Sequence, residues 1–166
     1  MGKASAIISS IIVAIVAMAT VSCNSSGCTD NQSSLPMAGF YSSVTNAAIS
    51  ISQLEIYGVG APNDSVLYHS GQALTQVYLP FRSSTEKTSF VFHYTQGQLD
   101  SEEFNDTLTF TYKSIPYFAS EECGAMYRYQ ITKIEQTYHV IDSVTMTDSL
   151  VTNIEKERIK IYFRTS

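Results

Sequence analysis

The chain has 166 residues and a formal net charge of −5, with 44% apolar residues, 11 tyrosines and no tryptophan. This length and apolar content suffice for one domain with a single hydrophobic core. The acidic balance, without a cluster of Lys or Arg, argues against binding to nucleic acid and against charge-driven adhesion to anionic lipid.

The first 22 residues have the layout of an export signal. Lys3 provides a positive charge, residues 6–19 form an apolar run, and residues 20–23 (TVSC) resemble the lipobox of bacterial lipoproteins. We therefore predict a signal peptide over residues 1–22, cleavage before Cys23, and lipid such as palmitate on the Cys23 sulfur. Two alternatives stay open: ordinary cleavage after Ala19, and an uncleaved transmembrane helix, for which the apolar run is short.

Cleavage before Cys23 would remove Lys3 and no acidic residue, so the mature chain would carry a charge of −6. We expect residues 23–40 to form the lipidated N-terminus and a short tether, and residues 41–166 to form the folded domain.

The cysteines support an exported protein. The chain has three of them, and lipidation of Cys23 leaves Cys28 and Cys123 as an even pair, which would oxidise outside the cytoplasm. We predict a disulfide between these two, the alternative being a free Cys28 in a flexible leader. Because Cys28 follows Cys23 so closely, the domain edge would lie within roughly 17–18 Å of the anchor at about 3.5 Å per residue. The sequence has no C-x-x-C motif or Cys/His cluster, so we expect no zinc site.

Beyond the leader, apolar residues alternate with polar ones, which is typical of strands that have one wet face. The pattern slips by one residue between Ile51 and Leu54 and again between Ile131 and Ile134. Such a slip inverts the two faces and predicts a bulge, a bend or a break. Four segments alternate in this way, and we predict that their apolar side chains point inward: Val77, Leu79 and Phe81; Phe90, Phe92 and Tyr94; the apolar members of residues 107–112; and Ile159, Ile161 and Phe163. Pro80 in the first segment indicates an edge strand or a strand end.

Turn-forming residues separate these runs at 58–64, 70–71, 82–87, 96–106 and 120–124. Residues 144–157 fit either a helical turn or a strand and loop. We predict an all-β fold: a single antiparallel β-sandwich or small barrel-like domain of about eight strands.

Motifs that carry chemistry are scarce. His69, His93 and His139 lack metal-ligand spacing, and we interpret His93 as a surface or satisfied histidine. Four acidic residues could attract calcium but lack an EF-hand pattern, so we predict a solvated hairpin loop for them: Asp100, Glu102, Glu103 and Asp106. Glu121 and Glu122 would point to opposite faces of a strand. The sequence has no nucleophile elbow and no phosphate-binding loop, so we expect no catalytic residue, cofactor or metal.

One triplet recurs four times: Asp, a hydroxyl residue, then an aliphatic residue. It resembles the acceptor motif of protein O-glycosylation in Bacteroidota, with candidate acceptors Ser65, Thr107, Ser143 and Ser149. The same triplet is also typical of a strand that begins after a turn. Both interpretations stay open.

Several segments together resemble a family of small, uncharacterised Bacteroidota lipoproteins with a β-rich domain of unknown function. They are Cys28-Thr29-Asp30-Asn31, Pro36, Phe40-Tyr41, Glu122-Cys123-Gly124, Tyr129-Gln130-Ile131, residues 139–144 and residues 159–163. The resemblance implies an envelope location, an all-β domain and the Cys28–Cys123 pairing, and it lends no activity. Surface-exported members of such families often carry an acidic run after the lipidated cysteine. Residues 24–27 are neutral here, which favours the periplasmic face of the outer membrane.

The sequence therefore predicts a non-catalytic lipoprotein of the cell envelope, with a binding or scaffolding β-domain and an unidentified envelope partner. A carrier of a small apolar ligand in a β-barrel is the first alternative, and a filled core without a cavity would exclude it. A periplasmic hydrolase is the second, and it would need a concave pocket that gathers two carboxylates or a Ser/His pair.

Overall fold

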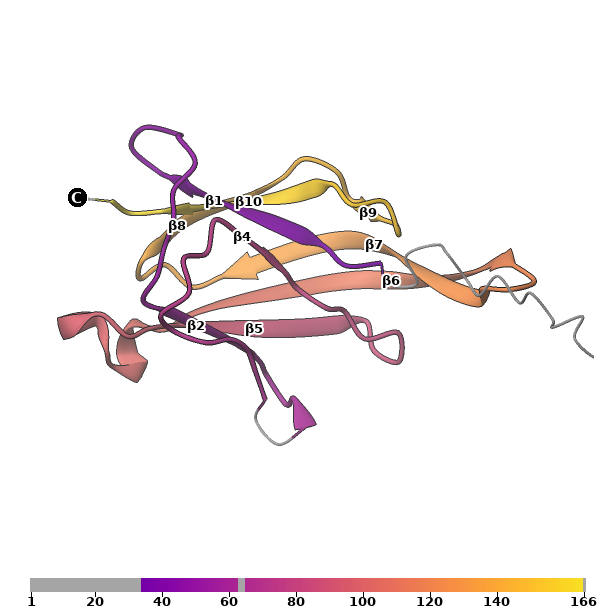
Figure 1. The fold of residues 1–166 in the computed structure, drawn as a ribbon, viewed down its shortest axis with the longest axis horizontal. Helices are drawn as coiled ribbons and strands as arrows, with labels where there is room; N and C mark the ends of the chain where they lie inside the picture. The colour runs from indigo at the N-terminus through magenta and orange to yellow at the C-terminus, as the bar shows by residue number, and fades with distance from the viewer. Residues whose placement is uncertain (1–33, 63–64, 166) are drawn as a thin grey trace, which may run out of the picture.

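The computed structural model describes residues 34–62 and 65–165, which form ten strands in two sheets (Figure 1). The four-stranded sheet has the order β4 (Gln76–Tyr78), β1 (Met37–Ser42), β10 (Glu157–Phe163), β8 (Ile141–Met146). The six-stranded sheet has the order β3 (Val66–Tyr68), β2 (Leu54–Gly58), β5 (Lys87–Tyr94), β6 (Asp106–Ser120), β7 (Gly124–Gln136), β9 (Leu150–Val151). Two short 3-10 turns, η2 (Gly97–Leu99) and η3 (Glu102–Phe104), connect β5 to β6.

The two sheets pack as a sandwich, and the described strands form no closed barrel. The all-β prediction is confirmed, with ten strands in place of about eight because β3, β4 and β9 are only two or three residues long. No helix in the described part of the chain is long and apolar enough to cross a membrane.

The core lies between the sheets and includes the predicted alternating positions. The six-stranded sheet contributes Phe90, Phe92, Leu108 and Phe110, and all four are buried. The facing sheet contributes Phe40, Val77, Ile159, Ile161 and Phe163. Period-2 alternation thus identified the inward faces of β5, β6 and β10 correctly.

Both predicted phase slips are confirmed. Thr111 pairs with Lys133 while Tyr112 pairs with Ile131, so Thr132 is the extra residue of a β-bulge. Ile51 lies outside the strands, in an isolated bridge to Leu74, before β2 begins.

One strand pair departs from the antiparallel prediction. β1 and β10, the first and last strands of the described chain, lie side by side and run parallel, from Met37 opposite Glu157 to Ser42 opposite Phe163. Their distance along the sequence removes the hairpin constraint that makes successive strands antiparallel. β1 also begins at Met37, so the boundary predicted at residue 41 falls inside the first strand.

The prediction that Asp106 lies in a solvated loop with its acidic neighbours is wrong, because its side chain is 0% exposed. Its Oδ1 accepts hydrogen bonds from the Thr137 hydroxyl (3.0 Å) and the His139 N–H (2.8 Å). Its Oδ2 accepts from the Tyr94 hydroxyl (2.9 Å) and from the N–H groups of Val140 (2.8 Å) and Ile141 (2.7 Å). The carboxylate therefore holds the connection that carries the chain from β7 in one sheet to β8 in the other.

We expect Asp106→Asn to destabilise the domain by about 2–4 kcal/mol, because either orientation of the amide turns an NH2 group toward backbone N–H donors. The free energy of unfolding in urea measures this cost. Asp100→Asn is the matched control: Asp100 has an exposed carboxylate 3.3 Å from His93, and its replacement should cost roughly 0.5 kcal/mol or less. Equal costs for the two variants would show that the buried network does not fasten the sheets.

Candidate functional site

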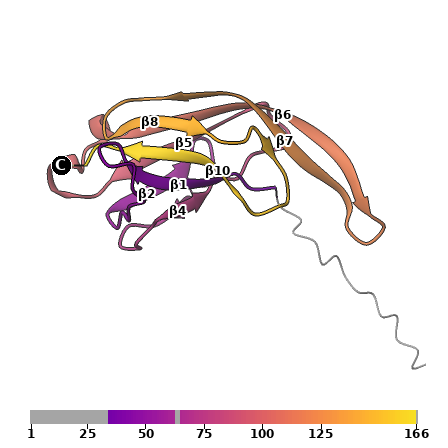
Figure 2. The same cartoon turned by 90° about the horizontal axis from the view of Figure 1, so that it is seen from above.

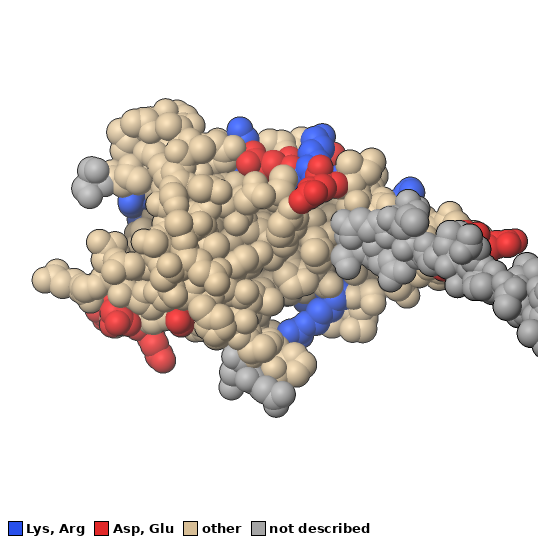
Figure 3. Space-filling model, viewed as in Figure 1, with Lys and Arg blue, Asp and Glu red and all other residues tan. Residues whose placement is uncertain are grey.

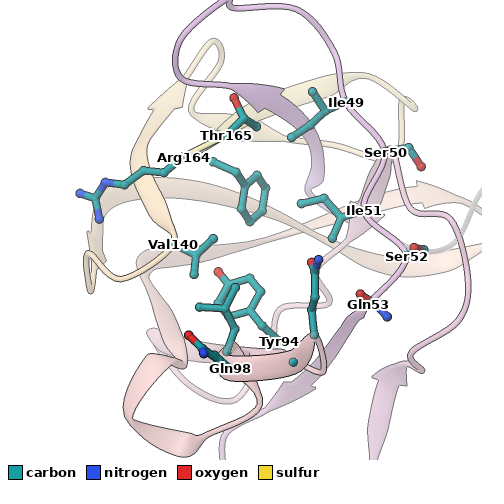
Figure 4. Close-up of a pocket in the computed structure, with 14 residues that line it drawn as sticks. Ile49, Ser50, Ile51, Ser52, Gln53, Tyr94, Gln98, Val140, Arg164 and Thr165 are labelled. Carbon is teal, nitrogen blue, oxygen red and sulfur yellow. The ribbon is translucent and has the colours of Figure 1, made fainter.

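A cavity of about 760 Å³ opens at the end of the sandwich that carries the C-terminus (Figure 4). Its walls come from residues 49–53, which lead into β2, and from Tyr94 at the end of β5 with residues 96–99 around η2. Val140 and residues 163–165 complete it. The cavity is thus bounded by both sheets and by the connections between them.

The cavity has an apolar interior and a polar rim. The side chains of Ile49, Ile51 and Val140 point into it (Figure 4). Hydroxyl and amide groups surround them, from Ser50, Ser52, Gln53, Gln96, Gln98 and Thr165. This arrangement suits a ligand with an apolar body and a hydrogen-bonding end.

Arg164 is the charged residue among the described lining residues, and its guanidinium turns away from the cavity (Figure 4). Nη1 donates to the carbonyl oxygens of Tyr138 and His139, both at 2.7 Å, and Nε lies 3.4 Å from Asp142 Oδ1. The interior is therefore electrically neutral, which favours an uncharged ligand.

Tyr94 joins the cavity to the Asp106 network, because it lines the cavity while its hydroxyl donates to Asp106. Burial raises the pKa of Tyr94 well above the ordinary 10.0, and the negative charge of Asp106 and the hydrogen bond raise it further. The phenol therefore stays protonated in the folded protein at a pH that ionises it in the unfolded chain.

This difference predicts a loss of stability in alkali. Above pH 10 the unfolded state releases the Tyr94 proton and the folded state keeps it, so the free energy of unfolding falls by up to about 1.4 kcal/mol per pH unit. We expect wild type to lose stability faster than Tyr94→Phe between pH 9 and 11, measured by urea unfolding at each pH. Parallel pH profiles would contradict this assignment.

The residues singled out for chemistry do not gather at the cavity. His93 Nδ1 lies 2.8 Å from Asn105 Oδ1 and its Nε2 lies 3.3 Å from Asp100 Oδ1, so it is satisfied as predicted. His139 Nδ1 donates to the Asn105 carbonyl oxygen at 2.8 Å. No Asp, Glu, His or Cys belongs to the described lining, and the described residues contain no cluster of three metal-ligating side chains.

The acidic residues divide between surface and core. Glu102 and Glu103 begin η3 and are exposed, as the solvated-loop prediction requires, whereas Asp106 is buried. Glu121 and Glu122 are exposed in the turn between β6 and β7. Figure 3 shows small acidic and basic groups separated by wide uncharged surface on the face in view.

Three of the four Asp-hydroxyl-aliphatic triplets stand where a strand begins. Ser65 precedes β3 and is exposed, Thr107 follows the first residue of β6, and Ser149 precedes β9. Ser143 lies within β8. Thr107, Ser143 and Ser149 are half-buried, and the hydroxyl of Ser149 accepts a hydrogen bond from Gln130 Nε2 at 2.6 Å. These positions favour the strand-start interpretation, and Ser65 is the most accessible of the four hydroxyls.

Of the cysteines predicted to carry lipid or to form the disulfide, the structure describes Cys123. Cys23 and Cys28 lie outside the described residues. Cys123 lies in the turn between β6 and β7 and is disulfide-bonded, and its N–H donates to Ser120 Oγ at 3.0 Å. The pairing of Cys123 with Cys28 stays a prediction.

Sequence reasoning missed the cavity residues. Its one usable signal was the phase slip after Ile51, which marks apolar side chains outside a strand and flanked by serines. The remaining walls come from segments that are distant in sequence, and no local pattern connects them.

A family of unknown function, DUF6452, matches the chain over residues 53–163, which is more than half of its length. The chain belongs to the DUF6452 family. The matched region contains β2 to β10 and the cavity residues Tyr94, Val140 and Phe163, and it begins after β1. No curated protein and no solved structure matches the chain.

Proposed function

We propose that the protein is a non-catalytic lipoprotein of the cell envelope whose β-sandwich binds a small, uncharged, largely apolar ligand. The anchor is lipid on Cys23, on the periplasmic face of the outer membrane, and the ligand site is the cavity beside Tyr94. The cavity itself is the observation that carries the binding function. The proposed carrier differs from the one expected from sequence, because its site lies at the open end of a sandwich and not inside a barrel.

Chemistry and size both support binding. About 760 Å³ falls in the range of small-molecule sites, and the lining combines apolar surface with a nearly equal share of polar surface that can orient a ligand. Ile49, Ile51 and Val140 supply the apolar surface, and the rim amides supply donors and acceptors.

The envelope location is supported by the leader ahead of Cys23 and by the disulfide at Cys123. Disulfides persist in oxidising compartments such as the periplasm. Membership of the DUF6452 family adds no activity to this proposal.

Filling the cavity should weaken binding of the probe N-phenyl-1-naphthylamine. We expect Val140→Phe to weaken its affinity at least about tenfold, because the larger ring occupies the space that the probe needs. Fluorescence titration of the purified protein measures this change.

Val44→Phe is the matched control, since it makes the same substitution on a loop residue that is 71% exposed and outside the cavity. It should bind the probe like wild type. A wild-type protein that does not bind the probe saturably, or equal weakening in both variants, would reject the cavity as the site.

Replacing the lipidated cysteine should release the protein from the membrane. We expect Cys23→Ala to move from the membrane fraction to the soluble envelope fraction and to lack the acyl mass found on wild type. Cys28→Ala, which changes the next cysteine along the chain, should stay with the membrane. Retention in the membrane of Cys23→Ala whose mass shows that the leader has been removed would refute the lipid anchor.

A further inference from the structure

The hairpin of β6 and β7 extends beyond the rest of the sandwich (Figures 1 and 2). β5 pairs with β6 only up to Thr111, and β9 pairs with β7 only at Tyr129 and Gln130. Beyond these residues the two strands pair with each other alone among the described residues, as far as the turn at Cys123. We name this part of the hairpin, residues 113–128, the overhang. Its Met126 is buried, whereas several of its other apolar side chains are exposed.

The overhang carries large apolar side chains that face solvent. Phe118 is 69% exposed, and Ile115 and Tyr127 are each 42% exposed. Pro116 pairs with Tyr127 and Phe118 pairs with Ala125, so Phe118 and Tyr127 share one face of the ladder. Other exposed apolar residues, such as Val44 and Ile154, lie singly on loops.

The first described residue of the chain contacts the overhang. The hydroxyl of Ser34, the first described residue, donates to the Tyr127 carbonyl oxygen at 2.6 Å. Ten residues lie between Cys23 and Ser34, and this stretch of chain can span at most about 40 Å. If Cys28 pairs with Cys123, Cys23 lies within roughly 17–18 Å of Cys28, and the disulfide adds about 5–6 Å between Cys28 and the turn. The anchor therefore leaves the domain at the overhang.

Charge on the overhang neither attracts nor repels a bilayer strongly. Lys113 and Arg128 balance Glu121 and Glu122. The Arg128 guanidinium lies 4.0 Å from the centre of the Tyr117 ring. Apolar side chains on a segment without net charge fit a lipid surface that is itself neutral.

We infer that the overhang rests on the bilayer with Phe118 and Tyr127 in its interfacial region. The cavity lies at the opposite end of the domain, beside the C-terminus (Figures 1 and 2), so its mouth faces the aqueous compartment. This orientation rests on the proposed lipid anchor, and it adds a second contact that prevents the domain from tumbling on its tether.

The absence of tryptophan from the sequence makes the test direct, because each substitution introduces a single tryptophan. Phe118→Trp and Tyr127→Trp place that residue on the overhang. Tyr138→Trp places it near the cavity, at a site with a matched exposure of 64%. All three sites are exposed, so the urea midpoints should equal that of wild type. The acylated proteins are reconstituted in dioleoylphosphatidylcholine vesicles with plain or brominated acyl chains.

We expect brominated lipid to lower the emission of Phe118→Trp and Tyr127→Trp at least about twofold, as interfacial side chains require, and to leave Tyr138→Trp unchanged. Two results with acylated protein would contradict the orientation and leave the anchor in place. One is no quenching of the overhang tryptophans, and the other is equal quenching of Tyr138→Trp. A mass spectrum with unmodified Cys23 would overturn the anchor and the orientation together, so the two failures are distinguishable.

Discussion

The fold depends on one buried carboxylate. Asp106 has no solvent exposure and accepts five hydrogen bonds, three of them from consecutive backbone N–H groups at residues 139–141. A buried anion is tolerated only where such donors surround it. The backbone donors lead into β8 of the four-stranded sheet, and Asp106 is the first residue of β6 in the six-stranded sheet. This contact therefore fixes the position of one sheet relative to the other at the cavity end. Tyr94 and Val140 are held in place by the same contact and form part of the cavity wall.

Two other crossings between the sheets are fastened in the same manner. The connection from β4 to β5 is held by Tyr112, whose hydroxyl donates to the Arg82 carbonyl (2.9 Å) and accepts from the Arg82 N–H (3.0 Å). The connection from β9 to β10 is held by the buried Arg158, which donates to the carbonyl oxygens of Ile154 (2.9 Å) and Lys156 (3.1 Å). In each loop, backbone groups that have no partner in a sheet instead form hydrogen bonds with a side chain from a neighbouring strand.

Sequence reasoning succeeded where the physical signal is local. Alternation identified the inward faces of β5, β6 and β10, and the slip before Ile134 located the bulge, because the side-chain period of a strand is two. It failed for Asp106, since four of the five donors that make its burial possible lie more than thirty residues away. It also failed for the cavity and the overhang. Alternation gives the face of a strand but does not say where the opposite sheet ends.

The parallel pairing of β1 and β10 has a mechanical consequence. The chain enters β1 at the overhang end and leaves β10 at the opposite end, so a pull on the two termini slides these neighbours lengthwise past each other. Their hydrogen bonds are evenly spaced along the pair and share the load, and they must break together and not one after another as in an unzipped hairpin. Tension between the membrane and anything attached at the C-terminus would therefore meet a mechanical clamp in the middle of the four-stranded sheet.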